Sequence, residues 1–351
     1  MPSLTACATA QSIPGDRRSD ATTMRVLVTG GAGYIGSHTA RMLHDLGHDV
    51  VVLDRNDASE LTSVAEVKAI QGDVGDARLL ESIFANHRLD AVVHLAGDKS
   101  VEGSLVDPGE YFANNVSATL MLLRTMVVSE VDVLVFSSTC AVYGPSNEPP
   151  LTERAHLDPQ TPYGETKLMV ERMLHWFDRA HTLRSVSLRY FNAAGAADDG
   201  RMGEEWTTAI NLIPMVMKAA TGRIPTLTVY GRDYPTPDGT AIRDYVHVID
   251  IAHAHLRALE YLSNGGPSRV LNLGTGRGAS VLEVIAAAER ASGRIIPLEN
   301  GLRRPGDLGA VWADSSKAEA ILGWRAERDL DAIVRSAWRW HSRASDAALR
   351  S

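Results

Sequence analysis

The sequence predicts an α/β fold with a doubly wound parallel sheet and a smaller C-terminal substrate-binding lobe. Three observations support it. From Arg25 onward, short β-branched runs alternate with longer amphipathic segments, which is the pattern of parallel strands joined by crossover helices. The first run leads directly into a glycine-rich turn and a helical pattern. After Asn192 the chain changes to short apolar segments punctuated by Gly, Pro and Asp, which indicates a second lobe.

Composition and charge restrict the class of protein. A length of 351 residues fits either one large domain or two packed domains, and we expect two. With 44% hydrophobic and 22% charged residues, the composition is that of an ordinary globular protein. The net charge of -8 argues against a general nucleic-acid binder, which needs clustered Lys and Arg. The apolar runs are far shorter than the ~20 residues of a membrane helix, so we expect no membrane span. Cys7 and Cys140 are too few for a disulfide framework or paired-cysteine zinc ligands, so we expect a cytoplasmic protein without a metal.

The alternating pattern places the elements of the first domain in order. The expected strands are Arg25–Thr29, Asp49–Leu53, Val67–Gln71, Ala91–Leu95, Val131–Ser137 and Ser185–Arg189. The expected helices are Tyr34–Leu46, Ala77–Asn86, Glu110–Ser129 and Tyr163–Ala180. We predict a loose N-terminal extension over 1–23, a nucleotide-binding domain over 24–192 and a substrate-binding lobe over 193–345. Arg243–Leu262 reads as a strand and a helix, so part of 240–262 can return to the first domain.

The turn after the first strand has the spacing of a dinucleotide-binding site. Gly30, Gly33 and Gly36 form a G-x-x-G-x-x-G pattern, with Tyr34 and Ile35 opening the following helix. The first glycine permits a tight turn, the second lets the backbone approach a pyrophosphate, and the third lets the helix pack on the sheet. The N–H groups at the helix start then face the anion. The alternative is a glycine-rich turn without a ligand.

Residues at the ends of the next two strands predict which dinucleotide binds. Asp54 ends the second strand, where a carboxylate accepts both ribose hydroxyls and repels a 2′-phosphate, so NAD is preferred over NADP. Arg55 follows and could instead pair with a phosphate. Asp73 and Val74 follow the third strand, and Asp73 could accept from the adenine amino group. An N-cap for the Ala77–Asn86 helix is the competing role, and the two are compatible.

The fourth and fifth strands end in small and hydroxyl residues. Ala96 and Gly97 form a corner that lets backbone lie against the cofactor, and Asn114 follows on the next helical segment. The fifth strand ends in Ser137 and Thr139, at the carboxyl edge where ligands bind in open α/β sheets. His94 is interpreted as a structural residue of the strand end.

A Tyr-x-x-x-Lys pair follows these strands. Tyr163 and Lys167 lie one helical turn apart, so their side chains share one face of the expected helix. A Tyr with a pKa near ~10 is a poor base at neutral pH, but a nearby ammonium and an oxidised nicotinamide can favour its phenolate form. The pair is common by chance, and the glycine turn and strand-end hydroxyls make it a candidate catalytic pair. The motif alone indicates interconversion of a hydroxyl and a ketone.

Together these motifs resemble the extended short-chain dehydrogenase/reductase family, and within it the enzymes that epimerise nucleotide sugars. The resemblance extends over Met24–Ser342 and is carried by the segments Val28–Thr39, His94–Gly97 with Lys99, Tyr111–Val116, Phe136–Gly144, Tyr163–Val170, Arg189–Gly195, Asp233–His247 and Arg304–Asp307. It implies that Lys99 and Phe191 contact the cofactor, with Ser137, Tyr163 and Lys167. The implied substrate-binding residues are Lys99, Thr139, Tyr163, Asn192, Asn211, Leu212, Tyr230, Arg243, Arg304, Asp307 and Val311.

The resemblance also implies a reaction and a partner. Tyr163, Lys167 and Thr139 would catalyse NAD-dependent C4 epimerisation of a UDP-hexose through a 4-keto intermediate, in a homodimer built on the helices near Glu110–Ser129 and Tyr163–Ala180. The related dehydratases carry an Asp-Glu pair where this chain has Cys140 and Ala141, so dehydration is disfavoured. Decarboxylation or simple reduction of a nucleotide sugar remains an alternative, as does a non-catalytic NAD-binding protein. Some relatives have Tyr at the position of Val311, and the smaller residue leaves room for an N-acetylated sugar.

Overall fold

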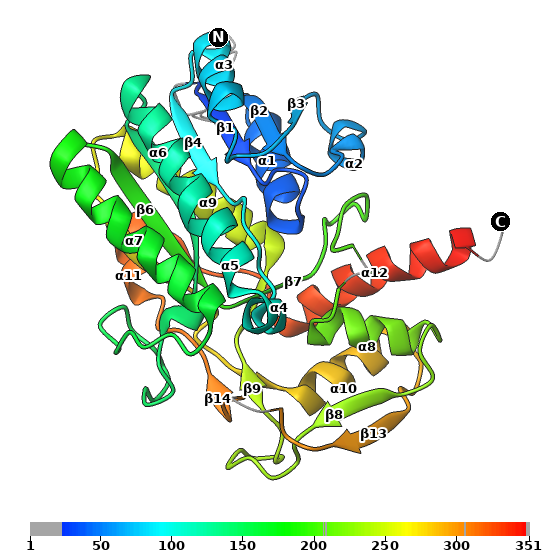
Figure 1. Ribbon diagram of the computed structural model, residues 1–351. Helices are drawn as coiled ribbons and strands as arrows, with labels where there is room; N and C mark the ends of the chain where they lie inside the picture. Colours follow the sequence, from blue (N-terminus) through cyan, green and yellow to red (C-terminus); the bar gives the residue numbers. More distant parts are fainter. Residues whose placement is uncertain (1–22, 206, 208, 305–306, 349–351) are drawn as a thin grey trace, which may run out of the picture.

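The computed structural model describes residues 23–348 except 206, 208 and 305–306 (Figure 1). Residues 1–22 of the expected extension lie outside the described residues. One seven-stranded sheet forms the centre of the larger layer, in the order β11-β6-β5-β4-β1-β2-β3, and every adjacent pair of strands is parallel. The strands are β1 (Arg25–Thr29), β2 (Asp49–Asp54), β3 (Lys68–Gln71), β4 (Ala91–His94), β5 (Val133–Thr139), β6 (Arg184–Tyr190) and β11 (Arg269–Leu273). The predicted doubly wound fold is confirmed.

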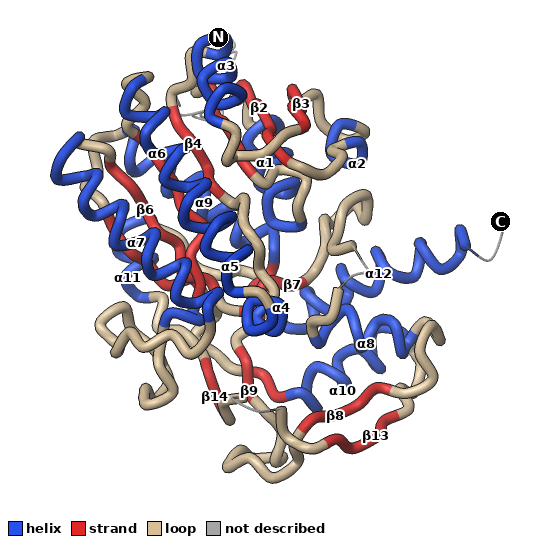
Figure 2. The backbone as a smooth tube through the Cα atoms, in the orientation of Figure 1, coloured by secondary structure: helices blue, strands red, loops and turns tan. Residues whose placement is uncertain are grey.

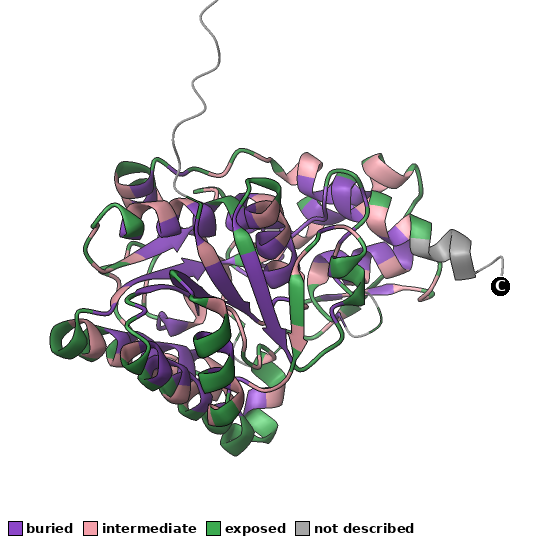
Figure 3. Ribbon diagram, turned by 90° about the horizontal axis from the view of Figure 1, so that it is seen from above, coloured by how far each residue is buried: buried purple, intermediate pink, exposed green. Residues whose placement is uncertain are grey.

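Helices cover both faces of this sheet (Figure 2). One face packs on α1 (Tyr34–Asp45), α9 (Val248–Ser263) and α11 (Ser316–Leu322), and the other on α3 (Ala77–His87), α6 (Ala118–Val128) and α7 (Pro162–His181). Side chains alternate between the two cores: Val26 and Val28 enter the first, and Leu27 the second. Strands buried on both faces therefore read as continuous apolar runs, and Figure 3 shows them enclosed between helices whose outer surfaces are exposed.

The chain returns to the sheet later than the sequence analysis expected. Helix α9 packs against α1 and lies within the 240–262 segment predicted to return, but β11 lies beyond it and pairs with β6 at the sheet edge. Parallel strands need a crossover connection, and the helix and its partner strand therefore return together. The residue boundaries of the two domains stay a prediction.

The second lobe is built from short strands and helices (Figure 1). Its strands are β7 (Asn192–Ala194), β8 (Leu227–Tyr230), β9 (Ile242–Arg243), β10 (Tyr245–His247), β12 (Ala279–Ser280), β13 (Leu298–Gly301) and β14 (Ala310–Val311). The helices α8 (Leu212–Ala220), α10 (Val281–Ser292) and α12 (Leu330–Ala348) pack together around an apolar core. These elements face the carboxyl ends of the parallel strands, beside the short helix α4 (Val101–Val106).

One predicted helix is divided in the structure. The segment expected to form a helix over Glu110–Ser129 consists of α5 (Pro108–Tyr111), a π-helical stretch over Phe112–Ser117 and then α6. A π-helical stretch widens the turn locally and is frequent at functional sites. Here it carries Asn114 and Asn115 toward the loop after β4, where both side chains hydrogen-bond. The remaining short helix of the first layer is α2 (Ser59–Thr62).

Candidate active site

The glycine turn lies at the point where the strand order reverses, between β1 and β4. Gly30 follows β1 with φ +73°, and a Cβ there would lie 2.5 Å from the Ala96 nitrogen. A Cβ on Gly36 would lie 2.0 Å from the Gly30 oxygen, so α1 can pack this closely only with glycine. A Cβ on Gly33 would meet only that oxygen, at 3.2 Å. Gly33 therefore borders open space at the start of α1, as a pyrophosphate site requires.

The carboxylate of Asp54 holds this turn in place. Its two oxygens accept from the backbone nitrogens of Ala32 and Asn56, each at 2.9 Å. Arg55 lies 3.7 Å from the Asp73 carboxylate and 3.5 Å from that of Asp98. The residue that could have paired with a 2′-phosphate is thus occupied by two acidic side chains, and this arrangement fits NAD.

Asp73 does not cap the helix that follows it. The N-cap of α3 is Asp76, whose side chain accepts from the nitrogens of Arg78 and Leu79. Asp73 instead accepts from the nitrogen of Gly75 at 2.6 Å and closes a tight turn. The N-cap alternative for Asp73 is therefore wrong, because the helix begins one turn later than that role requires. Val74 is buried in the core beside α3 and α6.

A corner after β4 joins the turn to the π-helical stretch. Gly97 has φ +149°, and a Cβ there would lie 2.8 Å from the Asn115 side-chain oxygen and 3.6 Å from the Lys167 nitrogen. The Asp98 carboxylate accepts a hydrogen bond from the Asn114 side chain at 2.6 Å. The backbone nitrogen of Asp98 donates to the side-chain oxygen of Asn115, and its carbonyl accepts from the side-chain nitrogen of Asn115. The sequence analysis did not single out Asp98, although its position directly after the predicted Ala96-Gly97 corner could have indicated a site residue. His94 bonds Thr29 and Thr119 and is fully enclosed, a structural role.

The catalytic candidates meet at the end of β5. Lys167 is buried beneath Phe136 and donates to the Ser137 carbonyl at 3.0 Å. Thr139 ends the strand, and its hydroxyl accepts from the Ala141 nitrogen at 3.2 Å. Tyr163 lies in the first turn of α7, whose N-cap Thr161 accepts from the Gly164 nitrogen. A Cβ on Gly164 would lie 2.4 Å from the Ala141 oxygen, so this glycine lets α7 begin directly against the end of β5.

Burial controls the protonation of the pair. Burial raises the pKa of Tyr163 to about 12, and a hydrogen bond with Thr139 acts in the opposite direction. Burial lowers the pKa of Lys167 to about 8, and the Asp98 carboxylate opposes this shift. The sequence analysis expected Lys167 to favour the phenolate, and that effect stays a prediction; burial is the largest influence on the pKa of Tyr163 and raises it.

A buried ion pair between α7 and β6 contacts the end of β5. Arg189 on β6 forms a bidentate pair with Glu171 on α7, at 2.9 and 2.5 Å, and both side chains are almost completely enclosed. Glu171 also accepts from the Ser138 hydroxyl at 2.5 Å. Arg189 donates to Tyr143, whose hydroxyl bonds Asn272 at 2.6 Å. The sequence analysis assigned no role to Glu171, because only the packing of α7 on β6 places it opposite an arginine.

The second lobe faces this site with cationic and aromatic side chains. Arg243 pairs with Asp307 at 3.1 Å and donates to the Leu308 carbonyl at 2.8 Å. Arg304 lies over the Tyr230 ring, 4.3 Å from its centre. The structure therefore forms two pairs of predicted substrate-binding residues, Arg243 with Asp307 and Arg304 with Tyr230, and the members of each pair lie far apart in sequence.

Val311 lies between these side chains of the second lobe and the residues at the end of β5. It pairs in register with Arg243 and packs against the apolar cluster that contains Phe191 and, at its margin, Cys140. Asn192 follows Phe191 and is exposed at the start of β7. A pocket of about 140 Å³ lies beside them, between the end of β5 and the segment after Arg304. It is lined by Val101, Ala141, Tyr143, Pro145, Gln160, Thr161 and Leu308.

The remaining predicted residues lie between the two lobes. Lys99 follows the β4 corner, and Asn211 is the N-cap of α8, which begins at Leu212. Lys99 and Asn211 both contact Glu204, a buried residue that the sequence analysis did not single out. Within 23–348, leaving aside the gaps named above, no group of three His, Cys, Asp or Glu residues could hold a metal ion. In the same part of the chain no helix has both the length and the apolar character needed to cross a membrane.

Known proteins resemble this chain in sequence and structure. A UDP-glucose 4-epimerase from Halalkalibacterium halodurans is 45% identical over 91% of this chain and 96% of that protein. A UDP-glucose-4-epimerase from Stenotrophomonas maltophila, solved with NAD and formylated UDP-arabinopyranose, is 42% identical with a TM-score of 0.89, over 92% of this chain and 99% of that one. The Bifidobacterium longum UDP-glucose 4-epimerase, solved with NAD⁺ and UDP, is 42% identical with a TM-score of 0.86, over 91% and 98%.

The family assignment rests on both kinds of evidence. The relatives above are 42–45% identical to the chain over 91–92% of its length. The model of the NAD dependent epimerase/dehydratase family matches residues 26–274, which is most of the chain. The chain belongs to the NAD dependent epimerase/dehydratase family.

Proposed function

We propose that this protein is an NAD-dependent UDP-glucose 4-epimerase that interconverts UDP-glucose and UDP-galactose. The single observation that carries the proposal is the meeting of Tyr163, Lys167 and Thr139 with the glycine turn on one side and Arg243 on the other. Tyr163, Lys167 and Thr139 beside a nucleotide-binding turn suit the oxidation and reduction of a carbon that carries a hydroxyl group. An arginine presents forked donors that match phosphate oxygens, as a nucleotide diphosphate requires.

The residues present fit the cofactor. Gly33 leaves room beside the first turn of α1, and Asp54, Ala96 and Gly97 line the adjoining carboxyl edge of the sheet. We assign the cofactor-binding residues as the sequence analysis did, with Phe191 near the nicotinamide. Bound NAD⁺ supplies the hydride acceptor and a positive charge that favours the phenolate.

The protein's residues then handle the proton of the sugar. Tyr163 removes the proton of the 4-hydroxyl, and Thr139 hydrogen-bonds the same oxygen. Lys167 remains largely protonated at neutral pH, because its pKa of about 8 lies above 7. Its charge stabilises the phenolate of Tyr163. The 4-keto sugar would then rotate so that the hydride returned by the cofactor reaches the opposite face of C4, while Tyr163 gives the proton back to the oxygen. The configuration at C4 would thus be inverted without net redox change.

The positions that separate epimerases from dehydratases favour epimerisation. Elimination of water needs an acid and a base beside the sugar. Burial raises the pKa of the Cys140 thiol to about 12, so it stays neutral at physiological pH, and Ala141 has no titratable group. Neither residue can supply the missing acid-base pair.

Turnover without added cofactor tests the proposal. We expect purified protein to convert UDP-galactose to UDP-glucose with no added NAD. The reaction is stopped and the protein removed before the UDP-glucose formed is measured with UDP-glucose dehydrogenase and NAD⁺. Tyr163→Phe should lose about 10²–10⁴-fold in kcat, the usual contribution of a positioned general base. Equal activity of the two proteins, or none in the wild type, would refute the assignment.

We also propose a homodimer and a cytoplasmic location. Helices α6 and α7 lie side by side on one face of the molecule (Figure 1) and carry exposed apolar residues, with Leu120 39%, Val128 84% and Trp176 65% exposed. A second copy packed there would remove this surface from water. Light scattering of wild type and Trp176→Asp tests it: the variant should shift toward monomer. The location is supported by the low cysteine content of the sequence.

A further inference from the structure

The loop between β7 and α8 lies against both lobes of the molecule. We call residues 195–204 the 195–204 loop. Ala196 and Gly203 pair as an isolated antiparallel bridge, so the loop has a base, where its two ends lie together, and a tip between them. Ala197 and Met202 are buried in the core on the α1 face of the parallel sheet. The loop therefore starts and ends in the second lobe, while its apolar side chains belong to the core of the first domain.

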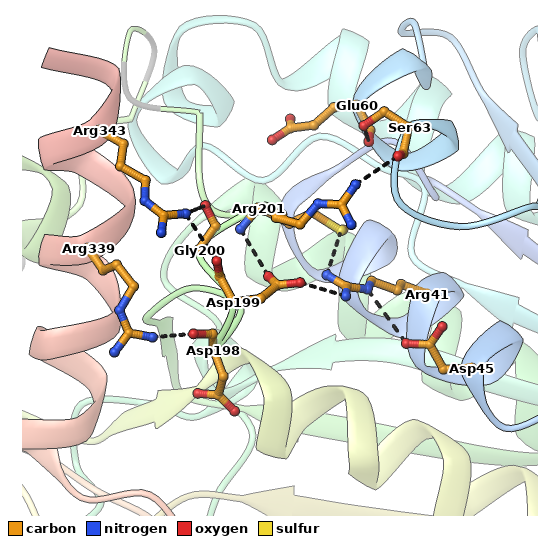
Figure 4. A network of polar contacts seen from close by, with 11 residues as sticks. Arg41, Asp45, Glu60, Ser63, Asp198, Asp199, Gly200, Arg201, Arg339 and Arg343 are labelled. Atoms are coloured by element: carbon orange, nitrogen blue, oxygen red, sulfur yellow. Dashed lines mark hydrogen bonds and ion pairs between the residues drawn. The ribbon is translucent and has the colours of Figure 1, made fainter. Parts of the chain in front are cut away.

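Arginines hold the tip between α1 and α12 (Figure 4). Arg41 on α1 pairs with the Asp199 carboxylate at 2.7 Å, and the two side chains are 22% and 37% exposed. Arg201 of the loop donates to the Ser63 carbonyl, directly after α2, at 3.0 Å. From the other side, Arg343 on α12 donates to two backbone carbonyls of the tip, each at 3.0 Å. The tip is thus fixed to the first domain through α1 and α2 and to the second lobe through α12.

Helix α12 also holds the base of the loop. The Ser336 hydroxyl accepts from the Ala196 nitrogen at 3.1 Å, and the Trp340 indole donates to the Glu204 carbonyl at 2.9 Å. A Cβ on Gly203 would lie 2.5 Å from the Trp340 ring, so the loop can pass over this ring only with glycine. The second lobe therefore sets the position of the base.

The base contacts the two segments assigned to the cofactor. On one side, the Tyr34 hydroxyl in the first turn of α1 donates to the Gly195 carbonyl at 2.6 Å. On the other side, Lys99 follows the corner after β4, and its ammonium lies 3.5 Å from the Glu204 carboxylate. Burial raises the pKa of Tyr34, and the charge of Glu204 acts in the same direction, so this hydroxyl stays a donor at neutral pH. The start of α1 and the corner after β4 are thus joined through the base of one loop.

This connection bears on how the cofactor leaves. NAD held between the start of α1 and the corner after β4 is released when these segments separate, and the base opposes that separation. The reaction proposed above regenerates NAD⁺ in every turnover, so a retained cofactor does not slow it. Release of NADH, by contrast, would leave the 4-keto sugar without its hydride donor. Slow release therefore suits an epimerase, whereas an ordinary dehydrogenase must exchange its cofactor in each turnover.

We propose that the 195–204 loop is a strap that retains NAD. Arg41 and Asp199 are its positioning residues: they hold the tip on α1 and thereby keep the base joined to the start of α1 and to the corner after β4. This rests on the proposed function, because slow release is useful only where the cofactor is regenerated in place. Neither residue is assigned to the cofactor or the sugar nucleotide, so changing them tests the strap without removing a contact to either ligand.

The release of NAD from the purified, NAD-containing protein tests the strap. Added NAD glycohydrolase destroys the NAD that leaves the protein, and the NAD still bound is measured over time after filtration and acid extraction. We expect Arg41→Met and Asp199→Ala to release NAD about fivefold faster than the wild type, the upper end of the scale for an exposed ion pair, because Arg41 is only 22% exposed. With NAD in excess, the kcat of both variants should stay within about twofold, because the tip contacts no reacting group.

Two comparisons make the test specific. Asp45→Ala is the matched control, because Asp45 also contacts Arg41, at 3.6 Å, but lies on α1 itself, and it should leave the release rate unchanged. Tyr34→Phe removes the hydrogen bond at the base and should speed release about tenfold or more, the scale of a buried carbonyl left without its donor. In that background, Asp199→Ala should add less than about twofold, since the tip acts through the base.

The outcomes separate a strap from a loop that only stabilises the fold. Unchanged release in both tip variants, whether or not their melting temperatures fall, would overturn the inference. An equal rise in Asp45→Ala, or independent effects of Asp199→Ala and Tyr34→Phe, would overturn it as well. Release is measured without a sugar nucleotide, so the result is separate from the wild-type turnover that tests the proposed function.

Discussion

The ammonium nitrogen of Lys167 lies 3.0 Å from the carbonyl oxygen of Ser137 and 5.0 Å from the centre of the Phe136 ring. The side chain is 4% exposed, so a charge that the reaction needs is kept where water cannot solvate it. Burial lowers the pKa of Lys167 from 10.5 to about 8. Proton binding by the folded protein is therefore weaker than by the unfolded chain, which costs stability at neutral pH.

Lys167→Met should lower the activity and raise the free energy of unfolding. Between pH 8 and 10.5 the unfolded chain binds more protons than the folded one, so the wild type regains stability as pH rises through this window. We expect the variant to be more stable by about 1–3 kcal/mol at pH 7, with the advantage shrinking toward pH 10.5. Urea unfolding at several pH values measures this. Lys68→Met, on an exposed lysine, is the control, and parallel pH dependences of Lys167→Met and wild type would contradict the prediction.

Two glycines of the turn should separate stability from cofactor binding. In Gly36→Ala the new Cβ would lie 2.0 Å from the Gly30 oxygen, so we expect a loss of about 1–3 kcal/mol from overpacking. In Gly33→Ala the contact is 3.2 Å, and the methyl group instead narrows the approach to the start of α1. That variant should fold with a smaller loss and retain less NAD. Thermal unfolding and NAD content after gel filtration distinguish the two, and a reversed order would be evidence against the assigned roles.

Val311→Tyr should narrow the range of sugars. Val311 packs at the margin of the cluster that contains Phe191, and a ring there would fill space available to a 2-acetamido group. We expect the ratio of UDP-GlcNAc to UDP-glucose turnover, measured as kcat/KM, to fall about tenfold or more, the scale of a blocked pocket. Val311→Ile is the conservative control. An unchanged ratio in the Tyr variant would sink the idea.

The buried pair behind β5 should be essential for stability. Glu171→Gln leaves Arg189 enclosed without a counter-charge, and we expect a loss of about 3–5 kcal/mol. The matched control is Asp331→Asn, which removes the partner of Arg290 from a pair with side chains 62% and 47% exposed, and should cost less than about 1 kcal/mol. Chemical denaturation of both proteins gives the comparison. A similar loss of unfolding free energy in the two variants would show that the enclosed ion pair stabilises the protein no more than the exposed one.

Features that depend on neighbouring residues were readable from the sequence. Strand β1, the glycine turn and α1 follow from an apolar run, three glycines and a helical period, all within a short stretch. The same holds for Tyr163 and Lys167, whose spacing on a helix determines that they share a face. The π-helical stretch over Phe112–Ser117 was not predicted, because it lies inside a segment that reads as one helix and its hydrogen-bond register is not visible in the sequence. The N-cap of α3, offered as a competing role for Asp73, belongs to Asp76, since either carboxylate suits the pattern.

By itself, the sequence determined the doubly wound sheet and which candidate residues stand at the ends of β1 and β5. Only the tertiary structure decided which distant residues meet: Glu171 with Arg189, Asp98 with Asn114 and Arg55, and Glu204 with Lys99 and Asn211. It also decided the protonation of the catalytic pair, because desolvation depends on what surrounds a group and not on its neighbours in the chain. Local periodicity specifies elements, while long-range packing specifies the electrostatic setting in which their side chains react.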